Sequence, residues 1–158
     1  MTKHRAFTVI ELFIGIAVMG MISSVALMSV NMAKQTAKRE AERVAAYIYR
    51  VIQSADRRGQ GFTLDTIFQD SEDGRREFFI EIKWQGERDY DRSFKASNGC
   101  TYSDNFNGNE RGELEYSTKK RQFFTGGTIT IHGADGKYYY VIIASTEGRI
   151  RISDTPPD

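Results

Sequence analysis

Residues 12–33 read LFIGIAVMGMISSVALMSVNMA, a run of 22 residues without a charged side chain. As a helix rising 1.5 Å per residue, the run would reach roughly 33 Å, and the hydrocarbon core of a bilayer is about 30 Å thick. It therefore predicts one transmembrane helix. Over all 158 residues, 27% are charged, which excludes a polytopic membrane protein.

Residues 34–58 become polar but keep a helical pattern. Apolar side chains recur every three or four residues from Ala37 to Ala55, the spacing of one helix face. Gly59 is the first strong stop signal. The segment predicts an amphipathic continuation of the same helix, and it is basic, with seven Lys and Arg against three Asp and Glu.

From residue 59 onward the pattern is that of strands. Polar and apolar residues alternate over residues 78–84. Further strand-like runs cover residues 114–116, 128–131, 138–143 and 149–152. Gly136 and Gly148 mark the turns between the last three runs, which predicts a three-stranded antiparallel meander. The rest of residues 93–121 is rich in Asn-Gly and predicts loops. Residues 59–158, called the β head below, carry 13 Lys and Arg against 17 Asp and Glu, a net charge of −4.

Three interpretations compete for the N-terminal region. A secretory signal peptide needs a small-residue cleavage site, which Ser24-Val25-Ala26 supplies, but Glu11 lies inside its apolar core. A plain membrane anchor gives no reason for that carboxylate either, because an unpaired charge in hydrocarbon costs several kcal/mol. The third interpretation is a short leader joined to an assembly helix, in which Glu11 has a purpose.

The stretch Ala6-Phe7-Thr8-Val9-Ile10-Glu11-Leu12 resembles the prepilin sequence of type IV pilins and type II secretion pseudopilins. The resemblance implies that prepilin peptidase cleaves between Ala6 and Phe7 and methylates the new amine of Phe7. It also implies that Glu11 pairs with the Phe7 amine of a neighbouring subunit during assembly. The implied location is the inner (cytoplasmic) membrane, crossed once with the head outside the cytoplasm, and then a hetero-oligomeric filament with other pilins or pseudopilins.

The head is similar to the GspH/FimT family of minor pilins and pseudopilins. The similarity lies in residues 47–50, 55–59 and 62–64 and in Gly148-Arg149-Ile150-Arg151-Ile152. It implies an α+β pilin fold, with a long transmembrane-plus-amphipathic helix packed on a sandwich-like antiparallel β head. The expected divisions are a leader at 1–6, a transmembrane and assembly helix at 7–33, an amphipathic helix at 34–58 and the β head at 59–158.

The arginine pair Arg149 and Arg151 supports two interpretations. Residues two apart on a strand point to the same side, so their guanidinium groups are presented together and suit phosphate. In FimT-type pilins a Gly-Arg-x-Arg motif, here Gly148 to Arg151, is implicated in DNA binding, and Lys119-Lys120-Arg121 would extend the patch. The alternative is an ordinary exposed strand. The net charge of −4 on the β head favours a structural subunit over a DNA-binding one.

No motif indicates an enzyme, a catalytic residue, a cofactor or a metal centre. Cys100 is expected to be a free or half-buried thiol and His132 a surface residue of a strand. The loop Asp104–Glu110 offers oxygen ligands for calcium but lacks the spacing of an EF-hand, so an Asn- and Gly-rich turn is expected.

Overall fold

The computed structural model describes residues 9–71, 76–87, 90–96, 99–106, 113–145 and 148–157, and for residues 11, 22, 24–36 and 90 it describes the backbone alone. The chain divides into two units, residues 1–33 and 34–158. Each unit is described by itself.

Helix α1 spans Val9–Arg58. In the second unit its buried face consists of the apolar residues spaced three or four apart, and Ala37, Val44 and Ile48 are fully buried. The helix ends at Gly59, whose φ of +64° is a left-handed conformation that favours glycine. The amide of Gln60 then donates to the carbonyl of Ala55, which closes the last turn.

Nine strands follow in the described part of the chain and form two antiparallel sheets. Their bounds are β1 Phe62–Asp70, β2 Arg76–Trp84, β3 Tyr90–Lys95, β4 Cys100–Asp104, β5 Leu114–Ser117, β6 Gln122–Phe123, β7 Gly127–Gly133, β8 Tyr138–Ile143 and β9 Ile150–Ser153. The five-stranded sheet has the order β3-β2-β1-β5-β6, and the four-stranded sheet has the order β4-β7-β8-β9.

The C-terminal meander predicted from the sequence is confirmed. β7 pairs with β8, and β8 pairs with β9, both antiparallel. The turns contain Gly136 and Gly148, both with positive φ. The loops predicted over residues 93–121 were only partly right, because β4 and the end of β3 also lie there. β4 is an edge strand with Thr101 and Ser103 exposed, so it lacks the apolar alternation that marks a half-buried strand.

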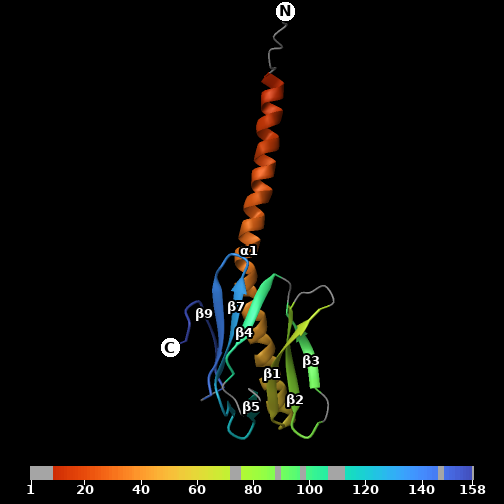
Figure 1. Cartoon of the computed structure of the whole chain (residues 1–158), viewed down its shortest axis with the longest axis vertical. Coiled ribbons are helices and arrows are strands. Elements are labelled where there is room, and N and C mark those ends of the chain that lie inside the picture. The colour runs from red at the N-terminus through yellow and green to blue at the C-terminus, as the bar shows by residue number, and fades with distance from the viewer. Residues whose placement is uncertain are drawn as a thin grey trace, which may run out of the picture. The chain divides into compact units, whose positions relative to one another are not determined.

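The inner faces of both sheets and the buried face of α1 form one core. Figure 1 shows the head part of α1 between the strands of the two sheets. The helix also contacts the outermost strand on each side. The hydroxyl of Tyr49 donates to the carbonyl of Ile150 in β9 at 2.9 Å, and the guanidinium of Arg43 donates to the carbonyl of Lys95 in β3. Because edge strands leave backbone groups unpaired, these bonds satisfy carbonyls that the sheets do not.

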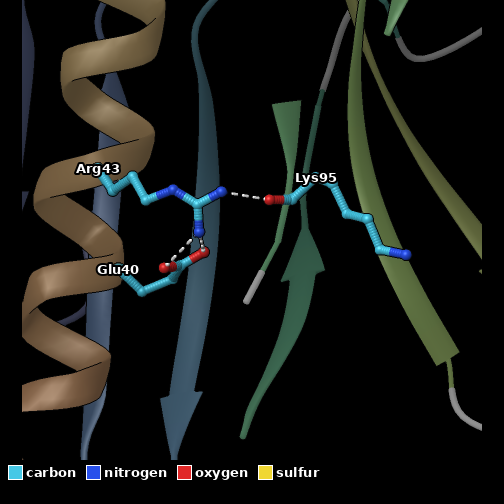
Figure 2. A network of polar contacts seen from close by, with 3 residues as sticks. All are labelled: Glu40, Arg43 and Lys95. Carbon is cyan, nitrogen blue, oxygen red and sulfur yellow. Dashed lines mark hydrogen bonds and ion pairs between the residues drawn. The ribbon is translucent and has the colours of Figure 1, made fainter. Parts of the chain in front are cut away.

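Arg43 is held in place by Glu40, one turn earlier on α1. Both carboxylate oxygens of Glu40 lie 3.0 Å from the same guanidinium nitrogen, and Glu40 is only 4% exposed. Figure 2 shows the guanidinium bridging from Glu40 to the carbonyl of Lys95 while the ammonium of Lys95 points away. The ring of Phe94 lies 4.7 Å below the guanidinium carbon. This bridge fixes β3 to the helix.

The predicted fold class, an α+β pilin fold with a long transmembrane-plus-amphipathic helix, is wrong. The described chain is mostly β, in two antiparallel sheets, and the described side chains of α1 fall mainly in two short stretches, residues 12–21 and 37–58. Nowhere in the described residues is a helix long and apolar enough to cross a membrane. The apolar stretch 12–21 would cover roughly 15 Å, about half of a hydrocarbon core. The side chains of residues 24–33, the rest of the predicted span, lie outside the described residues.

The same finding corrects two further expectations. The transmembrane helix predicted at residues 7–33 is contradicted, and so is the single-pass inner-membrane location that was predicted from it.

Candidate functional site

The arginine pair lies at the start of the last strand of the four-stranded sheet. The carbonyl of Arg149 accepts a hydrogen bond from the amide of Ala144, which holds the segment against the end of β8. Ile150 is buried, whereas Arg149 and Arg151 on either side of it are exposed. Alternation along the strand therefore presents both guanidinium groups to solvent.

A second basic segment meets this strand from the other sheet. Lys119, Lys120 and Arg121 form the turn between β5 and β6. A methyl group built on Gly148 would lie 2.9 Å from the carbonyl oxygen of Arg121. The two turns are thus in close backbone contact, and the structure brings together the two basic motifs found in the sequence. We call Lys119, Lys120, Arg121, Arg149 and Arg151 the basic surface.

Arg121 has an unusual backbone and a fixed partner. Its φ is +51°, the left-handed region that non-glycine residues rarely adopt. Its guanidinium lies 3.5 Å from the carboxylate of Asp56 near the end of α1. The hydroxyl of Tyr116 donates to the same carboxylate at 3.3 Å. Asp56 therefore fixes the turn to the helix and balances one of the five positive charges.

The pKa of Tyr116 reflects this environment. Burial of the ring and the neighbouring Asp56 carboxylate raise the pKa of the Tyr116 hydroxyl to about 12. The hydroxyl therefore stays protonated at neutral pH and remains a hydrogen-bond donor to Asp56. This support has no local signal in the sequence, because Asp56 lies 60 residues before Tyr116 and 65 residues before Arg121.

An exposed aromatic ring flanks the basic surface. Phe124 is 49% exposed, and the ammonium of Lys120 lies 5.5 Å from its ring centroid. Cations beside an exposed ring can bind a phosphate-bearing polymer by charge and by stacking. The chemistry that this arrangement of cations and an exposed ring supports is binding.

The other candidate residues are engaged in the fold. Burial, followed by the nearby carboxylates of Glu40 and Asp135, raises the pKa of the Cys100 thiol, which disfavours the reactive thiolate. The ring of His132 stacks on Tyr138 with centroids 4.4 Å apart. Both residues lie on the four-stranded sheet, Cys100 in β4 and His132 in β7.

The structure describes the first three residues of the loop Asp104–Glu110, which offers oxygen ligands for calcium. Asp104 accepts a hydrogen bond from Thr66 at 2.7 Å, and the side-chain oxygen of Asn105 accepts one from the amide of Thr128. Residues 107–110 of the loop lie outside the described residues. Within the described residues, no three His, Cys, Asp or Glu side chains are grouped to hold a metal ion.

The prepilin-like motif is described only in part. Ala6 and Phe7 lie outside the described residues, and Glu11 lies in α1 with its side chain outside them. No protein-family model matches the chain, and no curated protein or solved structure matches it either. The resemblance to pilins and pseudopilins therefore rests on the sequence motifs alone.

Proposed function

We propose that this chain is a minor pilin or pseudopilin, a structural subunit of a type IV pilus or of a type II secretion pseudopilus. Its partners would be other pilins or pseudopilins, and prepilin peptidase would cleave between Ala6 and Phe7 and methylate Phe7. The observation that carries the proposal is the exposed apolar stretch at the beginning of α1.

Large apolar side chains on this stretch are mostly more than half exposed. They are Val9 71%, Ile10 71%, Leu12 61%, Phe13 69%, Ile14 60%, Ile16 62%, Val18 48%, Met19 72% and Met21 70%. Exposed apolar surface of this extent marks an interaction site. Its residues surround the helix instead of forming one stripe, and a helix that is apolar all round needs partners on several sides. A bundle of equivalent helices from neighbouring subunits provides such partners.

In this bundle Glu11 would fix the axial register between the helices of neighbouring subunits. A carboxylate within an apolar helix is costly unless it is paired. In the proposed assembly its partner is the amine of Phe7 on a neighbouring subunit. Replacement of Glu11 by Val should therefore impair assembly without affecting the fold of residues 34–158.

The test is incorporation into sheared filaments in cells that express the other subunits. Leu12→Asn together with Ile16→Asn should abolish incorporation, because it places two amides in the helix bundle. Ser23→Asn, a change on the same helix at a residue that is already polar, serves as the control and should be incorporated normally. Normal incorporation of the double variant would refute the proposal.

DNA binding by a minor pilin is the second candidate, favoured by the backbone contact between Gly148 and Arg121 that joins the two basic motifs. Nucleic-acid affinity of this kind falls steeply with salt, with a slope that loses about one unit for each phosphate contact removed. Anisotropy titrations of labelled DNA should show that loss for Arg149→Ala and Arg151→Ala, and no change for Lys137→Ala in the β7–β8 turn.

The net charge of −4 on the β head supports the proposal of a structural role over DNA binding. DNA binding with a dissociation constant weaker than the roughly 10⁻⁴ to 10⁻⁶ M of ordinary non-specific complexes would support the structural role. Micromolar DNA binding that is abolished by Arg149→Ala would instead favour the DNA-binding role.

A further inference from the structure

β9 is an edge strand of the four-stranded sheet and pairs with β8 on one side (Figure 1). The amide of Ala144 donates to the carbonyl of Arg149, and the register of the two strands places these residues directly opposite each other. They therefore form a hydrogen-bonded pair. In an antiparallel ladder such pairs alternate with non-hydrogen-bonded pairs, and the pairs that contain Ile150 and Ile152 are of the second kind.

The backbone groups of Ile150 and Ile152 therefore point away from β8, toward the open edge of the sheet. α1 satisfies the carbonyl of Ile150, which accepts the hydrogen bond from Tyr49. Within the described part of the chain, no such bond reaches the backbone of Ile152. At Ile152, β9 thus presents one donor and one acceptor in the direction in which a further strand would lie.

The side chain of Ile152 lies on the inner face of the sheet. Alternation along the strand places it on the same side as Ile150, which belongs to the core and is only 7% exposed. Ile152, by contrast, is 37% exposed. The apolar face of β9 is therefore covered at Ile150 and left open at Ile152.

A cavity of about 400 Å³ lies beside Ile152, within the range of volumes typical of ligand sites. Its lining residues come from α1, from β8 and from the end of β9, and they are Lys38, Glu42, Tyr139, Ile152, Ser153 and Asp154. The cavity thus lies between the helix and the open edge of the sheet. A residue that pairs with Ile152 on a further strand would point its side chain to the same face, and so into this cavity.

The lining of the cavity combines apolar and charged groups. Ile152 and the ring of Tyr139 supply the apolar part, whereas Lys38, Glu42 and Asp154 are exposed and charged. An apolar centre with a polar rim is typical of a protein interface. The two carboxylates and one ammonium favour a segment in which an apolar residue has a basic neighbour.

Neither the tail of this chain nor a second copy suits the open edge. Pro156 and Pro157 follow β9 and have no amide hydrogen to donate. Two copies joined antiparallel through β9 would place Arg151 opposite Arg151 or Arg149, or would place Asp154 opposite buried Ile150, depending on the register. Like charges directly opposite each other are destabilising, and so is a carboxylate beside a buried apolar residue.

We propose that β9 accepts an extended strand from a different pilin or pseudopilin subunit. The added strand hydrogen-bonds to the backbone of Ile152 and places an apolar side chain in the cavity. In strand addition, main-chain hydrogen bonds supply affinity and pockets for alternate side chains supply specificity. The inference rests on the proposed function and deepens it, because it names the surface through which the head recognises another subunit.

Ile152→Pro tests the backbone contact in the full chain, in cells that express the other subunits. Proline removes the outward amide hydrogen, and at an edge position of this kind it leaves the ladder with β8 intact. Its incorporation into sheared filaments should fall at least about tenfold, whereas Ile152→Val, which keeps the amide, should stay within about twofold of the parent. The Tm of both purified variants in non-ionic detergent should lie within about 4 °C of the parent. Normal incorporation of Ile152→Pro would overturn the proposal.

Lys38→Trp tests the cavity and leaves every backbone bond of β9 in place, so it decides the matter if Ile152→Pro does not fold. The larger side chain fills the space that the added strand needs. Arg39→Trp is the matched control, because Arg39 is the next residue on α1, is exposed and does not line the cavity. Lys38→Trp should reduce incorporation at least about tenfold and Arg39→Trp by less than about twofold. Equal incorporation of the two variants would refute the docking contact.

A photo-crosslinking residue identifies what lies at the edge. Benzoylphenylalanine in place of Asp154, at the rim of the cavity, should form an adduct with an extended segment of a different subunit in filaments. Addition of Lys38→Trp to the same chain should abolish that adduct. An adduct with DNA, an adduct with a second copy of this chain, or no adduct would count against strand addition.

Filament incorporation also separates this inference from the proposed function. If the Leu12→Asn, Ile16→Asn variant is excluded from filaments while Ile152→Pro and Lys38→Trp are incorporated like the parent, strand addition is refuted and the proposed function stands. If the Leu12→Asn, Ile16→Asn variant is incorporated normally, the proposed function fails and this inference fails with it.

Discussion

Replacement of Gly148 by Ala tests whether the two basic turns are joined as the structure has them. The φ of Gly148 is +59°, and an alanine in this region costs about 1 kcal/mol. The added methyl carbon would also lie 2.9 Å from the carbonyl oxygen of Arg121, closer than real Cβ contacts. To relieve this clash, the turn at Gly148 must move away from the turn at Arg121. That displacement should lower the free energy of unfolding by a further 1–2 kcal/mol, roughly the cost of an overpacked contact.

Gly136→Ala provides the matched control. Gly136 also has a positive φ, +74°, but a methyl group there would meet nothing within 4 Å. Both changes reduce the conformational freedom of the unfolded chain equally, so that contribution cancels in the comparison. For a chain of this size, about 1 kcal/mol shifts Tm by roughly 2–4 °C.

Thermal unfolding followed by circular dichroism measures the difference. Gly136→Ala should lower Tm by about 2–4 °C and Gly148→Ala by about 4–12 °C. Equal losses in the two variants would show that the turns are not in contact, and the basic surface would then be two separate patches.

Three further changes test how the helix and sheets are held. Arg43→Ala should lower the free energy of unfolding by about 1–2 kcal/mol in denaturant titrations, because buried Glu40 loses the guanidinium that contacts both of its oxygens. A loss under about 0.3 kcal/mol would contradict the bridge. Tyr49→Phe should cost about 0.5–1.5 kcal/mol through the lost bond to β9, and unchanged stability would exclude that bond. Asp65→Asn should stabilise the chain by about 0.2–1 kcal/mol at pH 7, because it removes a half-buried charge and its repulsion from Glu113. That gain should shrink as pH falls through the raised pKa of Asp65, since the folded parent then binds the proton more tightly than the unfolded chain. A gain independent of pH would contradict a penalty on the charged carboxylate.

The sequence predicted the elements whose residues are close together along the chain. The meander followed from alternation and from glycines at its turns, because pattern and turn chemistry are both local. Edge strand β4 was missed because Thr101 and Ser103 face solvent and its packing is set by a distant partner, β7. The transmembrane prediction failed on the described residues, where the apolar stretch 12–21 is too short.

The candidate site was predictable only in its parts. Arg149 and Arg151 stand out in the sequence because their spacing places them on one side of a strand. The close approach of the neighbouring Gly148 to Arg121, and the role of Asp56 in holding Arg121, depend on packing between two sheets and a helix. Such long-range contacts leave no local pattern.

The most direct test of the proposed function is the intact mass of the chain after co-expression with prepilin peptidase. The account predicts a mature chain that begins at Phe7 and carries a methyl group on its new amine. An uncut chain in the presence of active peptidase, or a chain cleaved after Ala26, would contradict it.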